Sequence, residues 1–295
     1  MIPDGIHHDF SPSKYHAWHF QPDAGPISTS VLKRFASGGP RAVFSMKPLD
    51  PSPALVWGSL VDCLNFTPGE FKKEFVCASE CDDLSEDGSF RKKAAREWRD
   101  AILAGGQTVV TDEQFEGATD AVKVLRSTPA SARLLEGANY QTALVYTGDH
   151  GVAAKGLADC IPGEGSDCIV DLKTTSANIY SDDDLSRSVI RFGYHMQAAF
   201  YLFIYNKISD KPRKSWKIIW QSNKAPYEVR VTTLDNLTLD AGEEMVEEYF
   251  SRLLDRMKSC NWDSPFLEKE TVLRMHGPSV YAEEAKLEML SEIEK

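Results

Sequence analysis

Asp171 and Lys173 stand two residues apart in the segment CIVDLKTT, with types and spacing that suit metal-assisted chemistry on a phosphate ester. The segment is apolar enough to form a strand, in which alternate side chains share a face, so both residues point the same way with Cα atoms ~6.6 Å apart. Asp159 ends an earlier predicted strand, and a hairpin would place its carboxylate beside that of Asp171. Such a group suits a hard divalent cation, because Mg²⁺ prefers oxygen ligands and keeps several waters. Lys173 would then orient or help deprotonate a metal-bound water and stabilise charge on the phosphate.

An acid-x-Lys triplet alone is weak support for a site. Glu70 with Lys72 and Glu284 with Lys286 repeat the spacing in segments predicted as solvated helices. A lone triplet is therefore more often structural. Asp171 differs in context, because it ends an apolar strand and follows a strand that itself ends in aspartate.

A helix predicted behind these residues carries polar groups along one stripe. Tyr194, Gln197, Tyr201 and Tyr205 are spaced by three, four and four residues, which places them on one helix face. A purely structural stripe would be more aliphatic, although buried tyrosines with hydrogen-bond partners are common. The spacing alone leaves core packing and a role in a site equally open.

Residues 1–130 are predicted to form a mainly helical N-terminal lobe. Helices are expected over 30–36, Pro53–Phe66 and 90–103, with another opened by Pro68. Thr111, with Gln114 three residues later, has the capping-box pattern that begins a further helix.

Residues 131–262 are predicted to form the catalytic sheet with its helices, because the hydrophobic period changes to alternation after residue 131. Strands are expected over 140–146, 151–159, 167–173, 216–222 and 227–233. Helices are expected over 193–207 and 243–259, and a tail of residues 263–295 would hold an acidic helix over 282–294. This order of elements indicates a single α/β domain spanning residues 1–295.

The composition is that of an ordinary globular protein, with 42% hydrophobic and 26% charged residues among 295, which excludes collagen-like, disordered and disulfide-scaffold classes. The six cysteines, the lack of a leader in MIPDGIHHDF and the short apolar runs predict a cytoplasmic protein that does not bind membranes. A net charge of −11 argues against wholesale coating of nucleic acid. It does not exclude a nuclease, because bound metal offsets the charge of catalytic carboxylates.

The pattern Asp159…Asp171-Leu172-Lys173, followed by Gln197 and Tyr201, resembles the PD-(D/E)XK nuclease superfamily in its RecB-like arrangement. More narrowly, the chain resembles the RecE-type (exonuclease VIII-like) phage exonucleases. That resemblance runs through the segments YHAW, ISTSVLKRFASGGP, GSLVDCLNFTPGEF, KGLAD, VDLKTT and YHMQAAFY. It implies a restriction-endonuclease-like core, a central mixed β-sheet flanked by helices.

The resemblance also implies an activity and partners. It implies a Mg²⁺-dependent exonuclease, with Mn²⁺ as a substitute and two ions per site, that degrades one strand of linear duplex DNA from its 5′ end. The 3′ overhangs would serve annealing-type recombination, and a ring-shaped homo-oligomer would work beside a single-strand annealing protein. The expected location is the cytosol of a bacterial host, with a phage or prophage origin.

The resemblance assigns the metal to three groups: Asp159, Asp171 and the backbone carbonyl of Leu172. It assigns Lys173 to the nucleophilic water, and Gln197 and Tyr201 to support of the site or contact with substrate. Two positions depart from the family pattern. Asp62 stands where the family usually has histidine, and it would still bind metal directly or through water. Gln141 stands where the family usually has an acid; it offers a carbonyl oxygen but no charge, so a second metal would bind more weakly.

A basic segment, RKKAAREWR, is the candidate for holding a DNA backbone through its cations Arg91, Lys92, Lys93 and Arg96; a solvated helix face is the alternative. Lys33, Arg34 and Arg41 are weaker candidates for a 5′-phosphate, and their spacing selects none of them. Two other functions stay open: a single-strand or structure-selective nuclease, and a catalytically weakened DNA-binding subunit.

Overall fold

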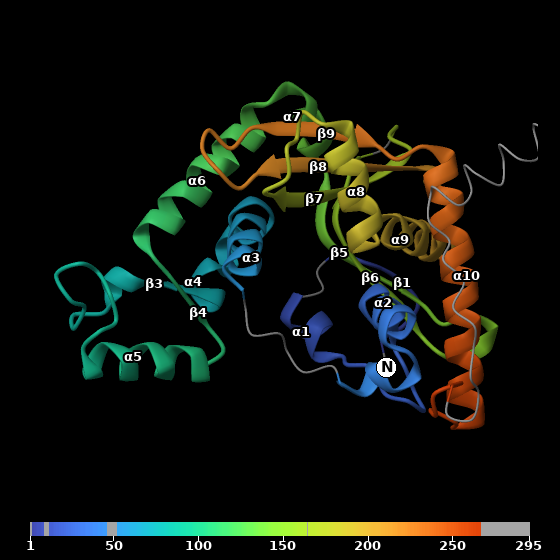
Figure 1. The fold of residues 1–295 in the computed structure, drawn as a ribbon. Helices are drawn as coiled ribbons and strands as arrows, with labels where there is room; N and C mark the ends of the chain where they lie inside the picture. The colour runs from blue at the N-terminus through green and yellow to red at the C-terminus, as the bar shows by residue number, and fades with distance from the viewer. Residues whose placement is uncertain (1, 9–11, 46–51, 164, 267–295) are drawn as a thin grey trace, which may run out of the picture. The chain divides into compact units, whose positions relative to one another are not determined.

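The structure is a computed structural model that describes residues 2–8, 12–45, 52–163 and 165–266 (Figure 1). The chain divides into two compact units, Met1–Asn261 and Trp262–Lys295. All the helices and strands described below belong to the first unit. The acidic helix predicted over 282–294 lies outside the described residues.

A mixed sheet forms the centre of the first unit, in the order β1-β5-β6-β7-β8-β9, with β2 paired to β6. The pairs β7–β8 and β2–β6 are parallel and the others are antiparallel, so the predicted mixed sheet is confirmed. A second, two-stranded sheet joins β3 and β4. The strands are β1 (Gly5–His7), β2 (Ile27–Ser28), β3 (Phe75–Cys77), β4 (Thr108–Val110), β5 (Asn139–Tyr146), β6 (Ala154–Ile161), β7 (Cys168–Thr175), β8 (Ser215–Ser222) and β9 (Val229–Thr233).

Helices cover both faces of the central sheet (Figure 1). They are α1 (Pro12–Ala17), α2 (Thr29–Gly38), α3 (Pro53–Phe66), α4 (Phe71–Glu74), α5 (Lys93–Ala104), α6 (Asp112–Ser127), α7 (Pro129–Leu135), α8 (Asp182–Phe192), α9 (Tyr194–Ile208) and α10 (Asn236–Ser259). On one face, α3, α6 and α7 pack on a core that includes Val170, Leu172 and Ile219. On the other face lies α9, against which α10 packs. None of the helices in the described residues is long and apolar enough to cross a membrane.

The alternation along β7 decides which face receives Asp171. Val170 and Leu172 belong to the core under α3, so Asp171 and its β8 neighbour Ile218 face α9. Asp171 therefore shares with Lys173 the face of β7 that α9 covers, where Gln197 can meet its carboxylate.

The sheet opens between β6 and β7. Along one edge, the first residues of β6 pair with β2, whereas its pairing with β7 is confined to Cys160 and Val170. β7 instead pairs along its whole length with β8. Asp159 and Asp171 occupy the next register position, at the start of this opening.

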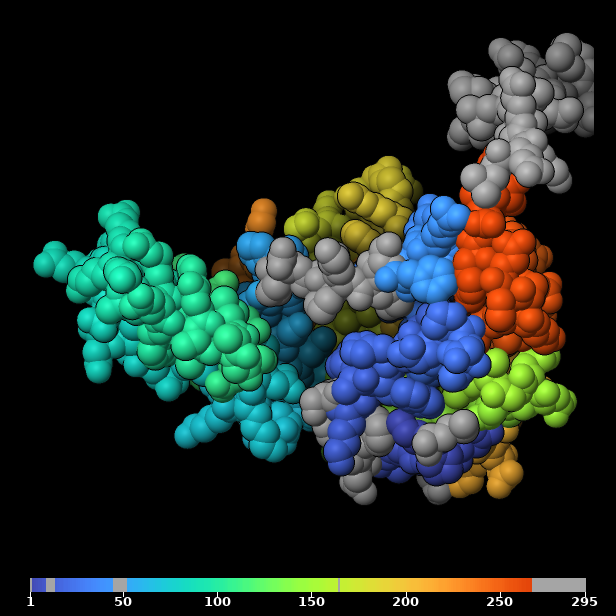
Figure 2. Space-filling model, turned by 90° about the horizontal axis from the view of Figure 1, so that it is seen from below, coloured from blue at the N-terminus to red at the C-terminus, as the bar shows by residue number. Residues whose placement is uncertain are grey.

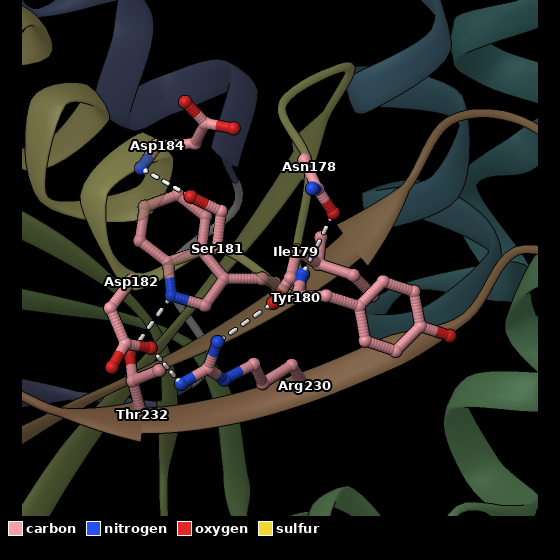
Figure 3. A network of polar contacts seen from close by, with 9 residues as sticks. Asn178, Ile179, Tyr180, Ser181, Asp182, Asp184, Arg230 and Thr232 are labelled. Carbon is pink, nitrogen blue, oxygen red and sulfur yellow. Dashed lines mark hydrogen bonds and ion pairs between the residues drawn. The ribbon is translucent and has the colours of Figure 1, made fainter.

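The loop from β7 to α8 is fastened to β9 by Arg230 (Figure 3). The guanidinium donates to the Ile179 carbonyl at 2.9 Å and pairs with the carboxylate of Asp182. Ser181 caps α8 by accepting from the backbone N–H of Asp184 at 3.2 Å. These bonds give α8 a fixed starting point directly after the strand that carries Asp171.

Several predicted boundaries are confirmed and others shift. The helix Pro53–Phe66 and the reciprocal cap between Thr111 and Gln114 are as predicted. The strand predicted over 151–159 is Ala154–Ile161, because residues 148–150 form a 3-10 turn, so Asp159 lies inside the strand rather than at its end. The basic helix begins at Lys93 rather than at residue 90. Helix α8 was not predicted.

Gly242 lets α9 and α10 approach closely, and its replacement by alanine is expected to destabilise the protein. A Cβ atom there would lie 2.3 Å from the backbone oxygen of His195, so α10 would have to move away from α9. We expect Gly242→Ala to lower the free energy of unfolding by about 1–3 kcal/mol, with a fall in Tm of roughly 2–4 °C for each kcal/mol. Thermal unfolding measures the effect, with Gly69→Ala as the control because a Cβ there meets nothing within 4 Å. Equal Tm values for the two variants would contradict this packing.

Candidate active site

Asp171 and Lys173 form an ion pair on β7. Lys173 Nζ lies 2.6 Å from Asp171 Oδ2. On the other side, Gln197 of α9 donates from Nε2 to Asp171 Oδ1 at 3.1 Å. Both carboxylate oxygens are engaged and the residue is only 2% exposed, so its orientation is fixed by strand and helix together.

Asp159 lies beside this pair across the opening of the sheet. Its Oδ2 accepts a hydrogen bond from the backbone N–H of Leu172 at 3.0 Å. The N–H and C=O of one strand residue point to the same edge, so the Leu172 carbonyl faces the same opening. The hairpin thus brings together the three oxygen donors that the sequence singled out.

Asp62 approaches the same group from α3, which packs on β7. Burial raises the pKa of Asp62 to about 7; Lys173 lowers this pKa and Asp171 raises it. Asp62 is therefore within electrostatic reach of the ion pair, and it shares the site with Asp159, whose pKa it also raises.

The protonation of the site reflects crowded negative charge. Burial raises the pKa of Asp159 well above its ordinary value, and Asp171 raises it further. Burial alone would lower the pKa of Lys173, but Asp171 and Asp159 raise it, so the side chain stays an ammonium. The raised pKa values favour the protonated forms of Asp159 and Asp62, and a bound cation would favour their ionised forms instead.

Two residues of α9 face the site in different ways. Gln197 holds Asp171, as described, whereas the ring of the buried Tyr201 packs against Gly156 of β6. Burial raises the pKa of Tyr201 to about 12, a rise that a hydrogen bond from the Leu157 backbone partly offsets. Tyr201 is also hydrogen-bonded to Tyr15 of α1. Tyr201 therefore lies between β6, the strand that carries Asp159, and α1.

Lys155 fastens that N-terminal segment to β6. Its Nζ donates to the carbonyl oxygens of Tyr15 at 2.7 Å and Trp18 at 2.6 Å, and it lies 4.0 Å from the centre of the Tyr15 ring. Burial lowers the pKa of Lys155 to about 8. The end of α1 is thereby held against the strand that carries Asp159.

A cleft of about 1320 Å³ opens beside these residues. Its lining includes Asp62, Gln141, Asp159, Gln197 and Tyr201. Figure 2 shows this side of the first unit hollowed between the blue N-terminal residues and the cyan-to-teal residues around β3, β4 and α5. Asp62 and Asp159 can therefore be reached by a ligand much larger than a metal ion.

Gln141 occupies the position opposite Asp159 in the β5–β6 register. The residues on either side of it pair regularly, but Gln141 itself does not, and its φ of 45° is in the left-handed region. A non-glycine residue in that region stores roughly 1–3 kcal/mol of strain and often marks a functional position. The side chain of Gln141 thus lines the cleft next to Asp159.

The donor set fits a hard divalent cation. In the described part of the chain, no three His, Cys, Asp or Glu side chains lie together as a complete metal-ligand cluster. The fit rests instead on Asp159, Asp171 and the Leu172 carbonyl, with water and a substrate phosphate in the remaining positions, as Mg²⁺ accepts. Asp171 Oδ2 is buried and makes no hydrogen bond besides its ion pair with Lys173, so it has a lone pair to offer.

The basic segment does not reach this site. Its four cations are engaged locally: Arg91 with Asp87 at 3.1 Å, Lys93 with Glu97 at 3.5 Å, Lys92 with the Leu84 carbonyl and Arg96 with the Arg91 carbonyl. None of the four lines the cleft. Their contact with DNA stays a prediction.

Sequence reasoning missed two features of the site. The first is the pair of hydrogen bonds from Lys155 to the end of α1. The local sequence does not indicate them, because the two acceptors lie 137 and 140 residues away along the chain. The second is a contact of Tyr194, which was predicted on the helix stripe: its ring centre lies 5.0 Å from Lys173 Nζ and 5.6 Å from Lys33 Nζ. Burial and the charge of Lys173 lower the pKa of Lys33 to about 8.

Comparisons with known proteins identify the family and the fold. The family described as "PDDEXK-like domain of unknown function (DUF3799)" matches residues 28–265. A solved structure from Eubacterium rectale, described as a candidate exonuclease, is 17% identical with a TM-score of 0.58, over 93% of this chain and 98% of that one; it shares the fold. An alkaline exonuclease from Laribacter hongkongensis is 13% identical with a TM-score of 0.30, over 66% of this chain and 96% of that one, a likeness too weak to argue from. None of the curated proteins matches the sequence.

Proposed function

The chain belongs to the family of PDDEXK-like domains, and from this premise we propose that it is a nuclease, a Mg²⁺-dependent exonuclease of linear double-stranded DNA. Mn²⁺ is expected to substitute for Mg²⁺. We propose that one strand is degraded from its 5′ end, which leaves 3′ overhangs for annealing-type recombination. A ring-shaped oligomer and a single-strand annealing partner belong to the same proposal.

One observation carries the proposal: Asp159, Asp171 and Lys173 meet where the sheet opens beside the cleft. The Asp171–Lys173 ion pair and the bond from Leu172 N–H to Asp159 fix three charged groups within one neighbourhood. Carboxylates that are buried and crowded bind a divalent cation well, because the cation relieves their mutual repulsion. An ammonium beside them suits a reaction at a phosphate, where negative charge develops.

Each residue then has a definite task. Asp159 and Asp171 would hold Mg²⁺, which when bound supplies Lewis-acid activation of water and charge stabilisation at the phosphate. Gln197 keeps the Asp171 carboxylate turned toward the opening. Lys173 stays protonated and donates a hydrogen bond to the attacking water or to a phosphate oxygen.

DNA binding is expected to be local and sensitive to salt. The chain carries a net charge of −11, so the whole surface does not attract DNA. Affinity would come from cations at the cleft and should fall as salt screens them.

The test is digestion of end-labelled DNA by the wild-type protein with Mg²⁺ or with EDTA. The substrates are a 5′-phosphorylated duplex, a 3′-recessed duplex, a single strand and closed circles. We expect Mg²⁺-dependent release of mononucleotides from the 5′ end of linear duplex, with circles left intact. Cleavage of single strands or circles in preference would support the single-strand or structure-selective alternative. Absence of any cleavage would support the catalytically weakened DNA-binding subunit.

Gln141→Glu should strengthen the metal site. The new carboxylate would stand next to Asp159 and add a charged ligand where the chain offers only an amide oxygen. We expect the Mg²⁺ concentration for half-maximal activity to fall by about tenfold, because ligand charge is a main determinant of affinity for hard cations. Metal titration of activity measures it. Gln21→Glu, which adds the same charge elsewhere in the lining of the cleft, is the control, and an equal shift in both variants would contradict a specific role for position 141.

A further inference from the structure

The junction between α8 and α9 carries cations and aromatic rings next to Lys173. Gly193 ends α8 with a φ of 61° and begins α9. A Cβ atom at Gly193 would lie 3.1 Å from Lys33 Cε, so the stem of Lys33 packs against this turn. Tyr194 follows directly, and its ring lies near the ammonium groups of both Lys33 and Lys173.

Lys33 faces an aromatic ring where a carboxylate would be expected. Among the described residues, no acid lies within ion-pair distance of its ammonium, which instead lies 5.6 Å from the centre of the Tyr194 ring. The charge of Asp171 raises the pKa of Lys33, but the Asp171 carboxylate is already paired with Lys173. A half-buried cation without an anion is costly, and a bound phosphate would supply the missing charge.

The series continues outward through Phe192 and Arg191. Phe192 is 49% exposed although it is a large apolar side chain. Its ring centre lies 5.6 Å from that of Tyr194, at an interplanar angle of 30°. The Arg191 guanidinium lies 5.4 Å from the Phe192 ring centre, and Arg191 is itself exposed. A series of contacts thus runs from Lys173 through the rings of Tyr194 and Phe192 to Arg191 at the surface.

We propose that Lys33, Arg191, Phe192 and Tyr194, the α8–α9 rim, bind a single-stranded segment of the DNA beside the scissile phosphate. Lys33 holds a backbone phosphate and Phe192 stacks on a base. This proposal rests on the proposed function. Cationic grooves with exposed rings are how proteins bind single strands without sequence preference. Inside a duplex both faces of each base are already stacked, so a single strand is the form that offers internal bases to Phe192.

The experiment uses the full chain in EDTA, so that binding is measured without cleavage. The probe is a single-stranded oligonucleotide with one 2-aminopurine, moved position by position and followed by fluorescence quenching and anisotropy. Phe192→Ala should abolish the quenching at one position and weaken binding at least about fivefold, the lower end of one base stack. Lys33→Gln should reduce the salt slope of log K by about 0.7, the value for one phosphate contact on a single strand.

Matched controls change the same side-chain types away from the rim. Leu237→Ala removes a large apolar side chain that is 80% exposed on α10, and Lys72→Gln removes an exposed lysine of α4. If both rim variants match these controls while the wild-type protein still degrades linear DNA, the rim proposal is wrong and the proposed function stands. If the wild-type protein neither binds nor cleaves DNA, the proposed function fails and the rim proposal fails with it.

Discussion

Lys173→Ala is expected to abolish phosphodiester cleavage while DNA binding changes by no more than a few fold. Removing one donor that stabilises charge in a transition state costs about 10²–10³ in rate. The charges of Asp171 and Asp159 both raise the pKa of Lys173, so its ammonium lies within electrostatic reach of both carboxyl groups. We expect the single-turnover rate to fall at least about 10³-fold. Gel-based cleavage and fluorescence anisotropy in the same buffer separate the two effects.

The loss cannot come from a lost metal. Lys173 competes with a cation for the Asp171 carboxylate, at 2.6 Å from Oδ2, so its removal leaves more negative charge to attract Mg²⁺. Metal affinity in Lys173→Ala should therefore equal or exceed that of the wild type, as measured by calorimetry.

A strand lysine outside the site provides the control. Lys217 of β8 donates to Thr233 Oγ1 at 2.8 Å on an exposed part of the sheet, and Lys217→Ala should retain full activity. Circular dichroism must show both variants folded. Full cleavage by folded Lys173→Ala would refute the mechanism.

The core of the site was predictable because its signals are local. Alternation along β7 puts Asp171 and Lys173 on one face, and the hairpin with β6 brings Asp159 to the same register position. Helix α9 was predictable because its stripe is long, and Gln197 lies on it one turn from Tyr194. In each case a repeat of two or 3.6 residues carries the information.

Other parts of the fold depend on distant contacts. The strands β1 and β2 have three and two residues, too few to show an alternation of apolar and polar side chains. Strand β2 pairs with the first residues of β6, which β7 leaves unpaired. Helix α8 begins with three aspartates after a serine, a composition that resembles a loop. It is a helix because Ser181 caps it and Leu185 and Val189 are buried.

The place of Lys33 beside the site depends on distant contacts too, and the sequence named it only as one of three equal candidates for a 5′-phosphate. Lys33 lies in a short helix whose sequence does not distinguish it from its neighbour Arg34, and only the packing of α2 against Gly193 brings it to Tyr194. Periodicity therefore predicts which residues share one face of a strand or helix. It does not predict which residues of α1 and α2 pack against them.

Asp171→Asn is expected to remove both metal binding and cleavage. Asparagine keeps the shape of the side chain and a group that can bond Gln197, but it loses the charge that a divalent cation needs. We expect Mn²⁺ or Mg²⁺ affinity to fall at least about 100-fold, because one of only two carboxylates in the donor set is lost, and the cleavage rate to fall with it.

Thermal unfolding reports the loss of metal without reference to catalysis. A metal at 100 times its Kd stabilises the folded state by about 2.7 kcal/mol, so Mg²⁺ should raise the Tm of the wild type and leave that of Asp171→Asn unchanged. Asp240→Asn, at an exposed position of α10, loses the same charge outside the site and should keep both the metal-induced rise and the activity. If Asp171→Asn still showed the full rise in Tm with Mg²⁺, the metal would lie elsewhere. The opening between β6 and β7 would then not be the active site, and the contacts of Asp171 with Lys173 and Gln197 would serve the fold alone.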